Sequence, residues 1–389
     1  MISESPLLLD VSRMLWRRWG GRQPTGIDRA CLAYGDHFGS RAQAVAQRGG
    51  LTRVLRPAPS HRLFEVLSED SAAFKRKVIS GLVRDVTLAP WRRPTYHGAL
   101  YLNVGHTGLD LAGHARWVRS SGVRAIYYIH DLIPISHPQY CRDGESCRHA
   151  LRLGTALALA GGIITNSHDS ASAIREFADR NGLACPVMLV APLGMSLPTV
   201  RHIGAAPIDG PYFVMVGTLE GRKNIAMILR AWEALAIEMD QATPRLVLIG
   251  ARGWMAEQVF TALDQNPVLQ QYVIELGKCN DAELLTYLSH ARALLFPSFV
   301  EGQGLPLAEA LAVGTPVIAS DLAVFRETAG AIPNYVEPND LAGWIRMVKE
   351  FSVPASIARS AQLSRLNGYS PPDWGDHFAL VDDWLCRLG

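Results

Sequence analysis

The chain has 389 residues, of which 48% are hydrophobic and 19% are charged. This length suits two domains of roughly 150–200 residues each, and the composition excludes a disordered chain. No run of about 18 uncharged apolar residues occurs, and the first residues lack the basic and apolar regions of a signal peptide. We therefore expect a cytoplasmic protein.

The net charge of +2 hides a difference between the two halves of the chain. Residues 1–200 contain 24 Lys and Arg against 15 Asp and Glu, whereas residues 201–389 contain 14 against 21. A basic half suits an anionic partner such as phosphate, a lipid diphosphate or an anionic membrane surface, although a solvated basic face would give the same count. The six cysteines show neither CxxC pairs nor zinc spacing, so we expect reduced thiols.

In the first half, short apolar runs alternate with amphipathic stretches. The predicted strands are Pro6–Val11, Ala99–Val104, Ala125–Ile129, Gly162–Asn166 and Val187–Ala191. The predicted helices are Asp28–Phe38, Asp110–Ser120 and Asp169–Asp179. Continuously apolar strands are typical of a parallel sheet that helices cover on both faces.

A segment rich in Gly, Pro and Ala at 196–211 predicts a linker between domains, after which the alternation restarts. The predicted strands there are Tyr212–Val216, Arg245–Ile249, Val273–Leu276, Ala293–Phe296 and Pro316–Ala319. The predicted helices are Ile225–Met239, Met255–Asp264, Asp281–Ala291, Leu305–Val313, Leu322–Ala329 and Asp373–Leu388. We expect an α/β protein with two doubly wound domains, 1–195 and 212–370, facing a cleft, and a last segment at 371–389.

The segment GTLEGRKN follows the predicted strand Tyr212–Val216 and precedes a helix. Its glycine turn at Gly217, the adjacent cations Arg222 and Lys223 and the helix N-terminus form a natural anion site. Cations have the wrong sign for a helix N-terminus, which suggests that they meet an anion there. A diphosphate leaving group needs this kind of stabilisation.

The segment EGQGLPLAE follows the predicted strand Ala293–Phe296. Glu301 lies in a glycine-rich loop at the strand end, and Glu309 lies about one turn into the next helix. Gly302 and Gly304 leave backbone N–H groups accessible and permit a ligand to approach closely. Two carboxylates near a helix start could bind the hydroxyls of a sugar and a ribose.

Together these segments resemble retaining glycosyltransferases with the GT-B fold, of the group 1 or family 4 type. EGQGLPLAE looks like the E-x7-E signature of that family, and GTLEGRKN resembles its diphosphate-binding loop. The stretch from Leu246 to Trp254 is similar to the subset rich in bacterial mannosyltransferases. In the first half, YYIHDLIP looks like the family's HD segment, and PTGIDR is similar to its first glycine loop.

This resemblance implies a role for each matching residue. Arg222 and Lys223 would hold the diphosphate, Glu309 the ribose hydroxyls, and Glu301 the transferred sugar. His130 would reach that sugar from the other domain, and the amides near Gly26 would meet a phosphate or the acceptor. Further backbone and base contacts would come from Gly302, Gln303, Gly304, Leu305, Gly277 and Lys278. The last helix would cross back to the first domain, and neither metal nor another cofactor would be needed.

Two positions depart from the family pattern. Thr218 stands where the wider family often has Arg, which removes one phosphate contact. Gln303 stands where an aromatic residue is usual, which puts the sugar preference in doubt. Glu301 and Glu309, whose spacing defines the signature, are both present.

The expected function is transfer of a sugar, with retention, from a nucleotide diphosphate sugar to a glycan or polyprenyl-diphosphate-linked acceptor, as in O-antigen synthesis. GDP-mannose is the first choice of donor and a UDP sugar the second. The segment Arg13–Arg22, which mixes Trp and Arg, is a candidate for peripheral contact with an anionic membrane. A non-catalytic sugar-nucleotide-binding protein and a sugar-nucleotide epimerase stay open. The chain contains no GxGxxG loop of the kind a dinucleotide oxidoreductase needs, and we expect no nucleic-acid partner.

Overall fold

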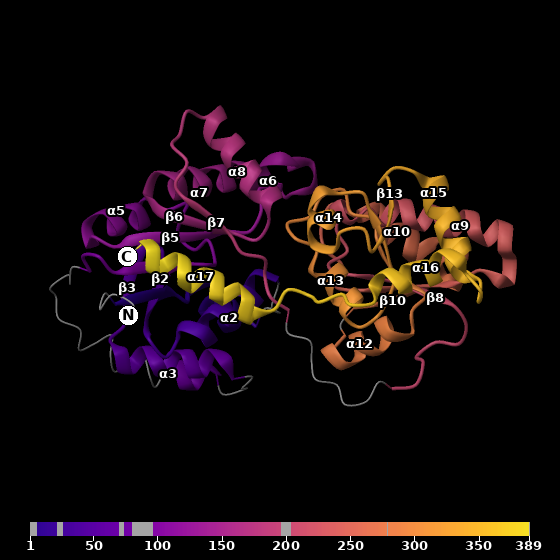
Figure 1. The fold of residues 1–389 in the computed structure, drawn as a ribbon, viewed down its shortest axis with the longest axis horizontal. Coiled ribbons are helices and arrows are strands. Elements are labelled where there is room, and N and C mark those ends of the chain that lie inside the picture. Colours follow the sequence, from indigo (N-terminus) through magenta and orange to yellow (C-terminus); the bar gives the residue numbers. More distant parts are fainter. Residues whose placement is uncertain are drawn as a thin grey trace. The chain divides into compact units, whose positions relative to one another are not determined.

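The structure is a computed structural model that describes residues 6–21, 26–69, 74–79, 96–195, 204–277 and 279–388. The chain divides into two compact units, both visible in Figure 1. The first consists of Met1–Ile135, Ser146–Leu193 and Trp374–Gly389, and the second of Ser136–Glu145 and Gly194–Asp373.

The first unit is a seven-stranded sheet in the order β3-β2-β1-β4-β5-β6-β7. Its strands are parallel except for the edge strand β3, which is antiparallel to β2. The strands are β1 (Leu7–Asp10), β2 (Ala42–Arg48), β3 (Leu51–Val54), β4 (Leu100–Asn103), β5 (Arg124–Ile129), β6 (Ala160–Thr165) and β7 (Met188–Val190). The helices are α1 (Ser12–Trp19), α2 (Gly26–Phe38), α3 (Pro57–Ser68), α5 (Ala112–Ser121), α6 (Ile133–Ser136), α7 (Glu145–Leu159), α8 (His168–Arg180) and α17 (Trp374–Leu388).

The second unit is a six-stranded, fully parallel sheet in the order β10-β9-β8-β11-β12-β13. Its strands are β8 (Tyr212–Val216), β9 (Arg245–Ile249), β10 (Val273–Leu276), β11 (Ala293–Phe296), β12 (Val317–Ser320) and β13 (Asn334–Val336). Its helices are α9 (Ile225–Met239), α10 (Glu257–Gln265), α11 (Pro267–Tyr272), α12 (Asp281–His290), α13 (Leu305–Ala312), α14 (Ala323–Ala329), α15 (Leu341–Ser352) and α16 (Ile357–Leu366), and its 3-10 turns are η1 (Pro138–Tyr140), η2 (Gly221–Lys223) and η3 (Asp240–Ala242).

Alternate residues of each buried strand in the second unit enter different cores, because successive side chains of a strand point to opposite faces. Phe213 of β8 packs with Trp232 and Trp344 in one core, whereas its neighbour Val214 packs with Phe325 in the other. Helices therefore cover both faces, as the continuously apolar strands predicted. The prediction of two doubly wound α/β units is confirmed.

The chain order reverses between β8 and β11 in the second sheet, and between β1 and β4 in the first. Ligands of doubly wound sheets bind beyond the strand ends at such a switch point. The loops that follow β8 and β11 therefore lie side by side where a ligand is expected. They are GTLEGRKN and the segment that contains EGQGLPLAE.

Two features differ from the prediction or fall outside it. The segment Ser136–Glu145, predicted within the first domain, groups with the second unit because its aromatic side chains pack there. Of the predicted linker, 196–203 lie outside the described residues and 204–211 group with the second unit. The last helix, α17, groups with the first unit and is drawn in yellow in Figure 1. None of the described helices is long and apolar enough to cross a membrane.

Candidate functional site

The loops after β8 and β11 are held to each other by hydrogen bonds. The Phe299 N–H donates to the carbonyl of Arg222 over 2.9 Å. The Asn224 side chain donates to the carbonyls of Pro297 at 3.2 Å and Pro338 at 2.7 Å. Asn224 has a left-handed backbone with φ of 55°, which an asparagine tolerates well. These contacts fix the two loops as one site.

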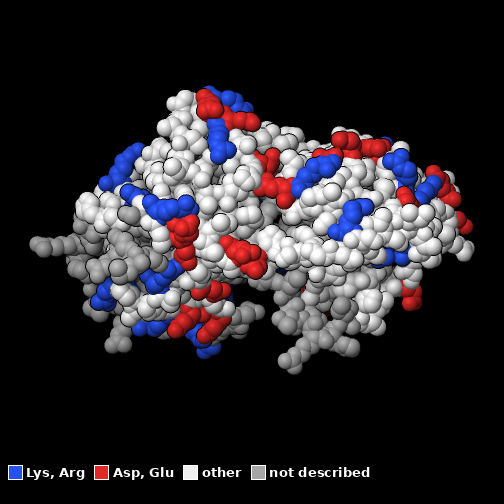
Figure 2. All heavy atoms as spheres, viewed as in Figure 1, with Lys and Arg blue, Asp and Glu red and all other residues white. Residues whose placement is uncertain are grey.

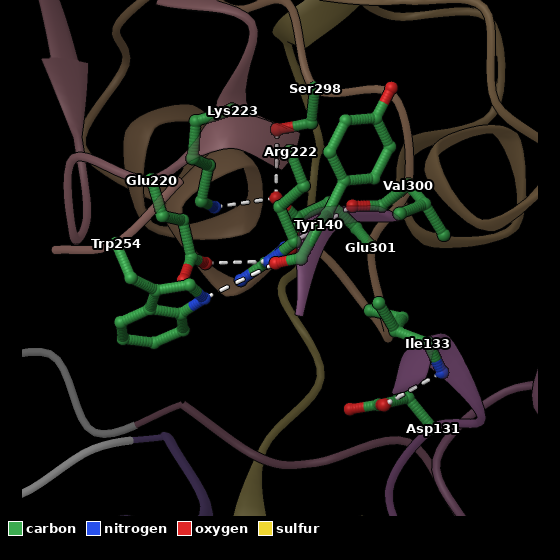
Figure 3. A network of polar contacts seen from close by, with 10 residues as sticks. All are labelled: Asp131, Ile133, Tyr140, Glu220, Arg222, Lys223, Trp254, Ser298, Val300 and Glu301. Atoms are coloured by element: carbon green, nitrogen blue, oxygen red, sulfur yellow. Dashed lines mark hydrogen bonds and ion pairs between the residues drawn. The ribbon is translucent and has the colours of Figure 1, made fainter. Parts of the chain in front are cut away.

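Two cations converge on the carboxylate of Glu301 (Figure 3). Lys223 Nζ lies 2.5 Å from Oε1, and Arg222 Nη1 lies 2.6 Å from Oε2. The Ser298 hydroxyl donates to Oε1 over 2.8 Å. Lys223 and Glu301 are buried, and the ammonium of Lys223 also lies 4.6 Å from the centre of the Phe296 ring. The residues predicted to bind the diphosphate and the sugar thus form one ion-paired cluster.

The two cations keep the Glu301 carboxylate ionised. Burial by itself raises the pKa of the Glu301 carboxyl, but the charges and hydrogen bonds of Arg222 and Lys223 outweigh it and lower the pKa to about 2. Burial lowers the pKa of the Lys223 ammonium, and the neighbouring Glu301 charge opposes this shift. Glu301 is therefore an anion at neutral pH.

Glu220 is a second buried carboxylate of the site, with no role assigned from the sequence. Its Oε1 lies 2.6 Å from Nε of Arg222, so that two carboxylates hold one guanidinium. Among the described residues, Oε2 of Glu220 has no hydrogen-bond partner. Burial raises the pKa of Glu220 against the opposing charges of Arg222 and Lys223. An acidic residue inside an otherwise basic loop was the sequence signal for it.

The backbone after Glu301 turns directly into α13. Gly304 precedes the helix with φ of 91°, and a Cβ there would lie 2.8 Å from the Phe325 ring. The buried Gln303 accepts a hydrogen bond from Thr328 Oγ1 at its carbonyl, 2.8 Å away. Leu305 is the first residue of α13. The half-buried Glu309 lies one turn further along, and Gly302 is half-buried in the loop itself.

The remaining predicted residues of the second unit lie at other strand ends. Gly217 directly follows β8 with φ of 130°, and a Cβ on Gly250 would lie 1.9 Å from its carbonyl oxygen. Close approach of these two backbones therefore requires glycine at position 250. Gly277 is exposed directly after β10, where the base was expected, and Lys278 lies outside the described residues.

The predicted His130 belongs to the first unit, directly after β5. Its Nε2 lies 2.8 Å from the carbonyl of Val104, so this nitrogen must donate and Nδ1 keeps its lone pair. Burial lowers the pKa of His130 to about 4, which keeps the ring neutral at pH 7. A neutral ring of this tautomer can accept a hydrogen bond from a hydroxyl. Gly26 is exposed as the first residue of α2.

The segment with mixed Trp and Arg is mostly the helix α1, and its side chains have partners within the first unit. Arg13 and Arg17 each place Nε within 2.8 Å of the Asp28 carboxylate. Trp16 donates its indole N–H to the carbonyl of Gln47 over 2.7 Å. On the face drawn in Figure 2, Lys and Arg are interspersed with Asp and Glu. These contacts join α1 to α2 and to β2.

In the part of the chain that the structure describes, no group of three or more His, Cys, Asp or Glu side chains is placed to hold a metal ion. None of the cysteines in these described ranges forms a disulfide.

Several known glycosyltransferases have sequences similar to this chain. The serotype-specific mannosyltransferase WbdA of Escherichia coli is 28% identical over 261 residues, which cover 61% of this chain and 32% of WbdA. The O-antigen chain mannosyltransferase RfbU of Salmonella typhimurium is 32% identical over 183 residues, which cover 45% of this chain and 47% of RfbU. D-inositol 3-phosphate glycosyltransferase of Thermomonospora curvata is 24% identical over 79% of this chain and 80% of that protein. The chain thus matches about a third of the length of WbdA and half that of RfbU.

Solved structures show the same fold. HepE from Anabaena, in complex with UDP, matches 98% of this chain and 100% of its own with a TM-score of 0.65 at 15% identity. Sucrose-phosphate synthase from Thermosynechococcus elongatus matches 99% of both chains with a TM-score of 0.65 at 17% identity. The family model described as glycosyl transferases group 1 matches residues 199–345. Residues 199–345 therefore match the group 1 glycosyltransferases, and the chain has the GT-B fold that the sequence resemblance implied.

Proposed function

We propose that the protein is a retaining glycosyltransferase that transfers a sugar from a nucleotide diphosphate sugar to a glycan or lipid-linked acceptor in bacterial surface polysaccharide synthesis. The observation that carries the proposal is the buried contact of Arg222 and Lys223 with Glu301 at the switch point of the second sheet. Paired cations of this kind suit a diphosphate, and a carboxylate beside them suits a sugar.

The cations would stabilise the departing diphosphate. Arg222 is held by two carboxylates, which orients its guanidinium before a ligand arrives. As the bond between the anomeric carbon and the phosphate oxygen breaks, the negative charge grows on that oxygen. Fixed positive charges stabilise this state more than the intact donor, which lowers the barrier.

Retention follows if the acceptor hydroxyl arrives on the face that the diphosphate leaves. Its oxygen bonds to the anomeric carbon, and its proton passes to the departing phosphate oxygen. Glu301, an anion at neutral pH, would position the sugar and stabilise its developing positive charge. The Nδ1 of His130 would accept a hydrogen bond from a sugar hydroxyl, because its Nε2 already donates to the carbonyl of Val104.

Similar proteins support the choice of donor and acceptor. The names of WbdA and RfbU specify a mannosyltransferase, and that of RfbU specifies the O-antigen chain. GDP-mannose is therefore the first donor to test, and a UDP sugar is second because HepE was crystallised with UDP. Glu309 would bind the ribose. The proposal includes neither metal nor another cofactor, so EDTA should leave the activity unchanged.

Peripheral contact with an anionic membrane is part of the proposal, because a polyprenyl-diphosphate-linked acceptor lies at a membrane surface. The basic excess of residues 1–200 supports it. Flotation with vesicles of phosphatidylglycerol tests it, and recovery of the protein only in the vesicle-free fraction would contradict it.

The experiment that tests the donor is a thermal-shift panel of GDP, UDP, dTDP, ADP and their sugars. It compares the wild type with Glu309→Ala and with Glu350→Ala, a half-buried glutamate on α15 as matched control. One nucleotide should raise Tm in the wild type and the control but not in Glu309→Ala. No shift with any nucleotide at millimolar concentration would contradict the proposal. A shift in Tm without turnover would favour a non-catalytic binding protein. Conversion of the sugar nucleotide into another sugar nucleotide in the absence of an acceptor would favour an epimerase.

A further inference from the structure

The segment Ser136–Glu145 belongs to the second unit, although the residues before and after it in the chain belong to the first. It contains the 3-10 turn η1 (Pro138–Tyr140) and supplies aromatic and basic side chains. Because these residues follow the HD segment, they come from the opposite half of the sequence from the donor loops. None of the residues of this segment was predicted from the sequence to belong to the site.

Tyr140 makes its first contact with the loop that carries Glu301. Its ring stacks on Phe299 with the ring centres 5.3 Å apart and the planes 3° from parallel. Phe299 lies two residues before Glu301, and its N–H donates to the carbonyl of Arg222. The stack therefore restrains the stretch of backbone that places the Glu301 carboxylate against its cations.

The second contact reaches the other loop through Trp254. The indole N–H of Trp254 donates to the carbonyl of Tyr140 over 3.2 Å (Figure 3). The carbonyl of Trp254 in turn accepts from the N–H of Gly221, the residue before Arg222. The guanidinium of Arg142 lies over the Trp254 ring at 4.9 Å, which fixes the indole further. One residue thus connects to both loops of the site.

We propose that Tyr140 is a positioning residue of the donor site, which holds the loops of Arg222 and Glu301 in register. The donor role rests on the proposed function, whereas the effect on the loops does not. Tyr140 and Phe299 are only half-buried, so their stack contributes little to the cores of the unit. Its loss should therefore loosen the loops without unfolding the sheet.

The contacts of Tyr140 with Phe299 and Trp254 use its ring and its main-chain carbonyl, whereas its hydroxyl is hydrogen-bonded to Gln139 within the same turn. Tyr140→Phe should therefore behave as the wild type, whereas Tyr140→Ala removes the stack. Tyr287→Ala is the matched control, because Tyr287 is a half-buried tyrosine on α12 whose ring meets Tyr212 of β8 edge-on. It removes the same atoms from the same unit.

The test is hydrogen exchange of the full-length, unliganded chain, followed by steady-state kinetics with GDP-mannose. In Tyr140→Ala we expect amides of 297–304 and 217–224 to exchange about tenfold faster, and KM for the donor to rise about tenfold with kcat reduced. The KM of Tyr140→Ala for the acceptor should stay near the wild-type value. Tyr140→Phe and Tyr287→Ala should match the wild type in both exchange and kinetics. Unchanged exchange in Tyr140→Ala, or equal acceleration in Tyr287→Ala, would overturn the proposal. If the wild type binds no nucleotide, the proposed function fails, and the exchange data alone decide the role of Tyr140.

Discussion

Lys223 and Glu301 are joined by a 2.5 Å contact between Nζ and Oε1, although 78 positions separate them in the sequence. With Arg222 and Glu220 they form a cluster of two cations and two carboxylates, which has no net charge when all four are ionised. A diphosphate that enters this cluster competes with Glu301 for its cations. The carboxylate that would bind the sugar thus also holds the cations in place until the donor arrives.

Glu301→Gln should separate these two roles. We expect GDP to bind at least as tightly as in the wild type, because the competing anion is gone, whereas kcat should fall roughly 10²-fold. The unliganded variant should lose stability, on the order of 1–3 kcal/mol, because the buried Lys223 and the half-buried Arg222 lose an anion. GDP titration calorimetry, turnover and urea denaturation measure the three effects.

Glu275→Gln provides the control for Glu301→Gln. Glu275, on β10, also pairs with an arginine, Arg252, but both side chains are more exposed than those of the pair between Arg222 and Glu301. Its neutralisation should leave GDP affinity and kcat unchanged. An unchanged kcat in Glu301→Gln would rule out the proposed role of that carboxylate.

Arg222→Ala should weaken GDP binding about 10- to 100-fold, because a charged hydrogen bond contributes roughly 1.5–3 kcal/mol. Arg222→Lys should recover only part of this, since Lys lacks the planar fork that contacts two acceptors at once. The difference in GDP affinity between the wild type and Arg222→Ala should shrink at higher salt, because salt screens the charge interaction. GDP titration at two ionic strengths measures this difference. Equal GDP affinity in Arg222→Ala and the wild type would mean that the diphosphate binds elsewhere.

Gly250→Ala should disturb the start of the first site loop. A Cβ at this position would lie 1.9 Å from the carbonyl oxygen of Gly217, so the backbone must shift. Gly330→Ala is the control, since Gly330 also has a positive φ of 56° but a Cβ there meets nothing within 4 Å. Gly330→Ala should cost about 1 kcal/mol and leave GDP binding intact. Gly250→Ala should cost more and weaken GDP binding, and equal effects of the two would contradict this account.

The sequence predicted the strands whose residues are continuously apolar, but not β2. The run Ala42–Arg48 contains Gln43 and Gln47, which read as solvent-facing positions. In the fold Gln47 is buried, because its amide donates to Asp10 and to the hydroxyl of Tyr101. A buried polar network cannot be distinguished from a surface by residue type alone, so this strand depended on tertiary contacts.

The same limit applies to the site. The glycines and cations of GTLEGRKN and the two glutamates of EGQGLPLAE are neighbours in sequence, so their spacing predicted them as site residues. Tyr140 and Trp254 are in contact although 114 positions separate them, and no local sequence pattern predicts that contact. Sequence therefore indicated the residues that would touch the ligand more readily than those that hold them.

The buried His377 of α17 predicts how the stability depends on pH. Its Nδ1 donates to the carbonyl of Pro192 at 2.9 Å, so its Nε2 accepts from the hydroxyl of Tyr34 at 3.0 Å. Burial lowers the pKa of His377 to about 4, against a usual value near 6.5. Between these values the unfolded chain binds a proton that the folded chain does not, so stability falls as the pH drops from 6.5 towards 4. At pH 5 this residue alone should cost roughly 1–2 kcal/mol relative to pH 7.

His377→Asn isolates this contribution, because an amide can donate to Pro192 and accept from Tyr34 but does not titrate. Urea denaturation at pH 7 and pH 5 should show a smaller loss on acidification in this variant than in the wild type. The exposed His61 serves as control, and His61→Asn should lose as much stability as the wild type. The other buried histidines are present in all three proteins, so their contributions cancel in the comparison. An equal loss in His377→Asn and the wild type would show that protonation of His377 does not destabilise the packing of α17.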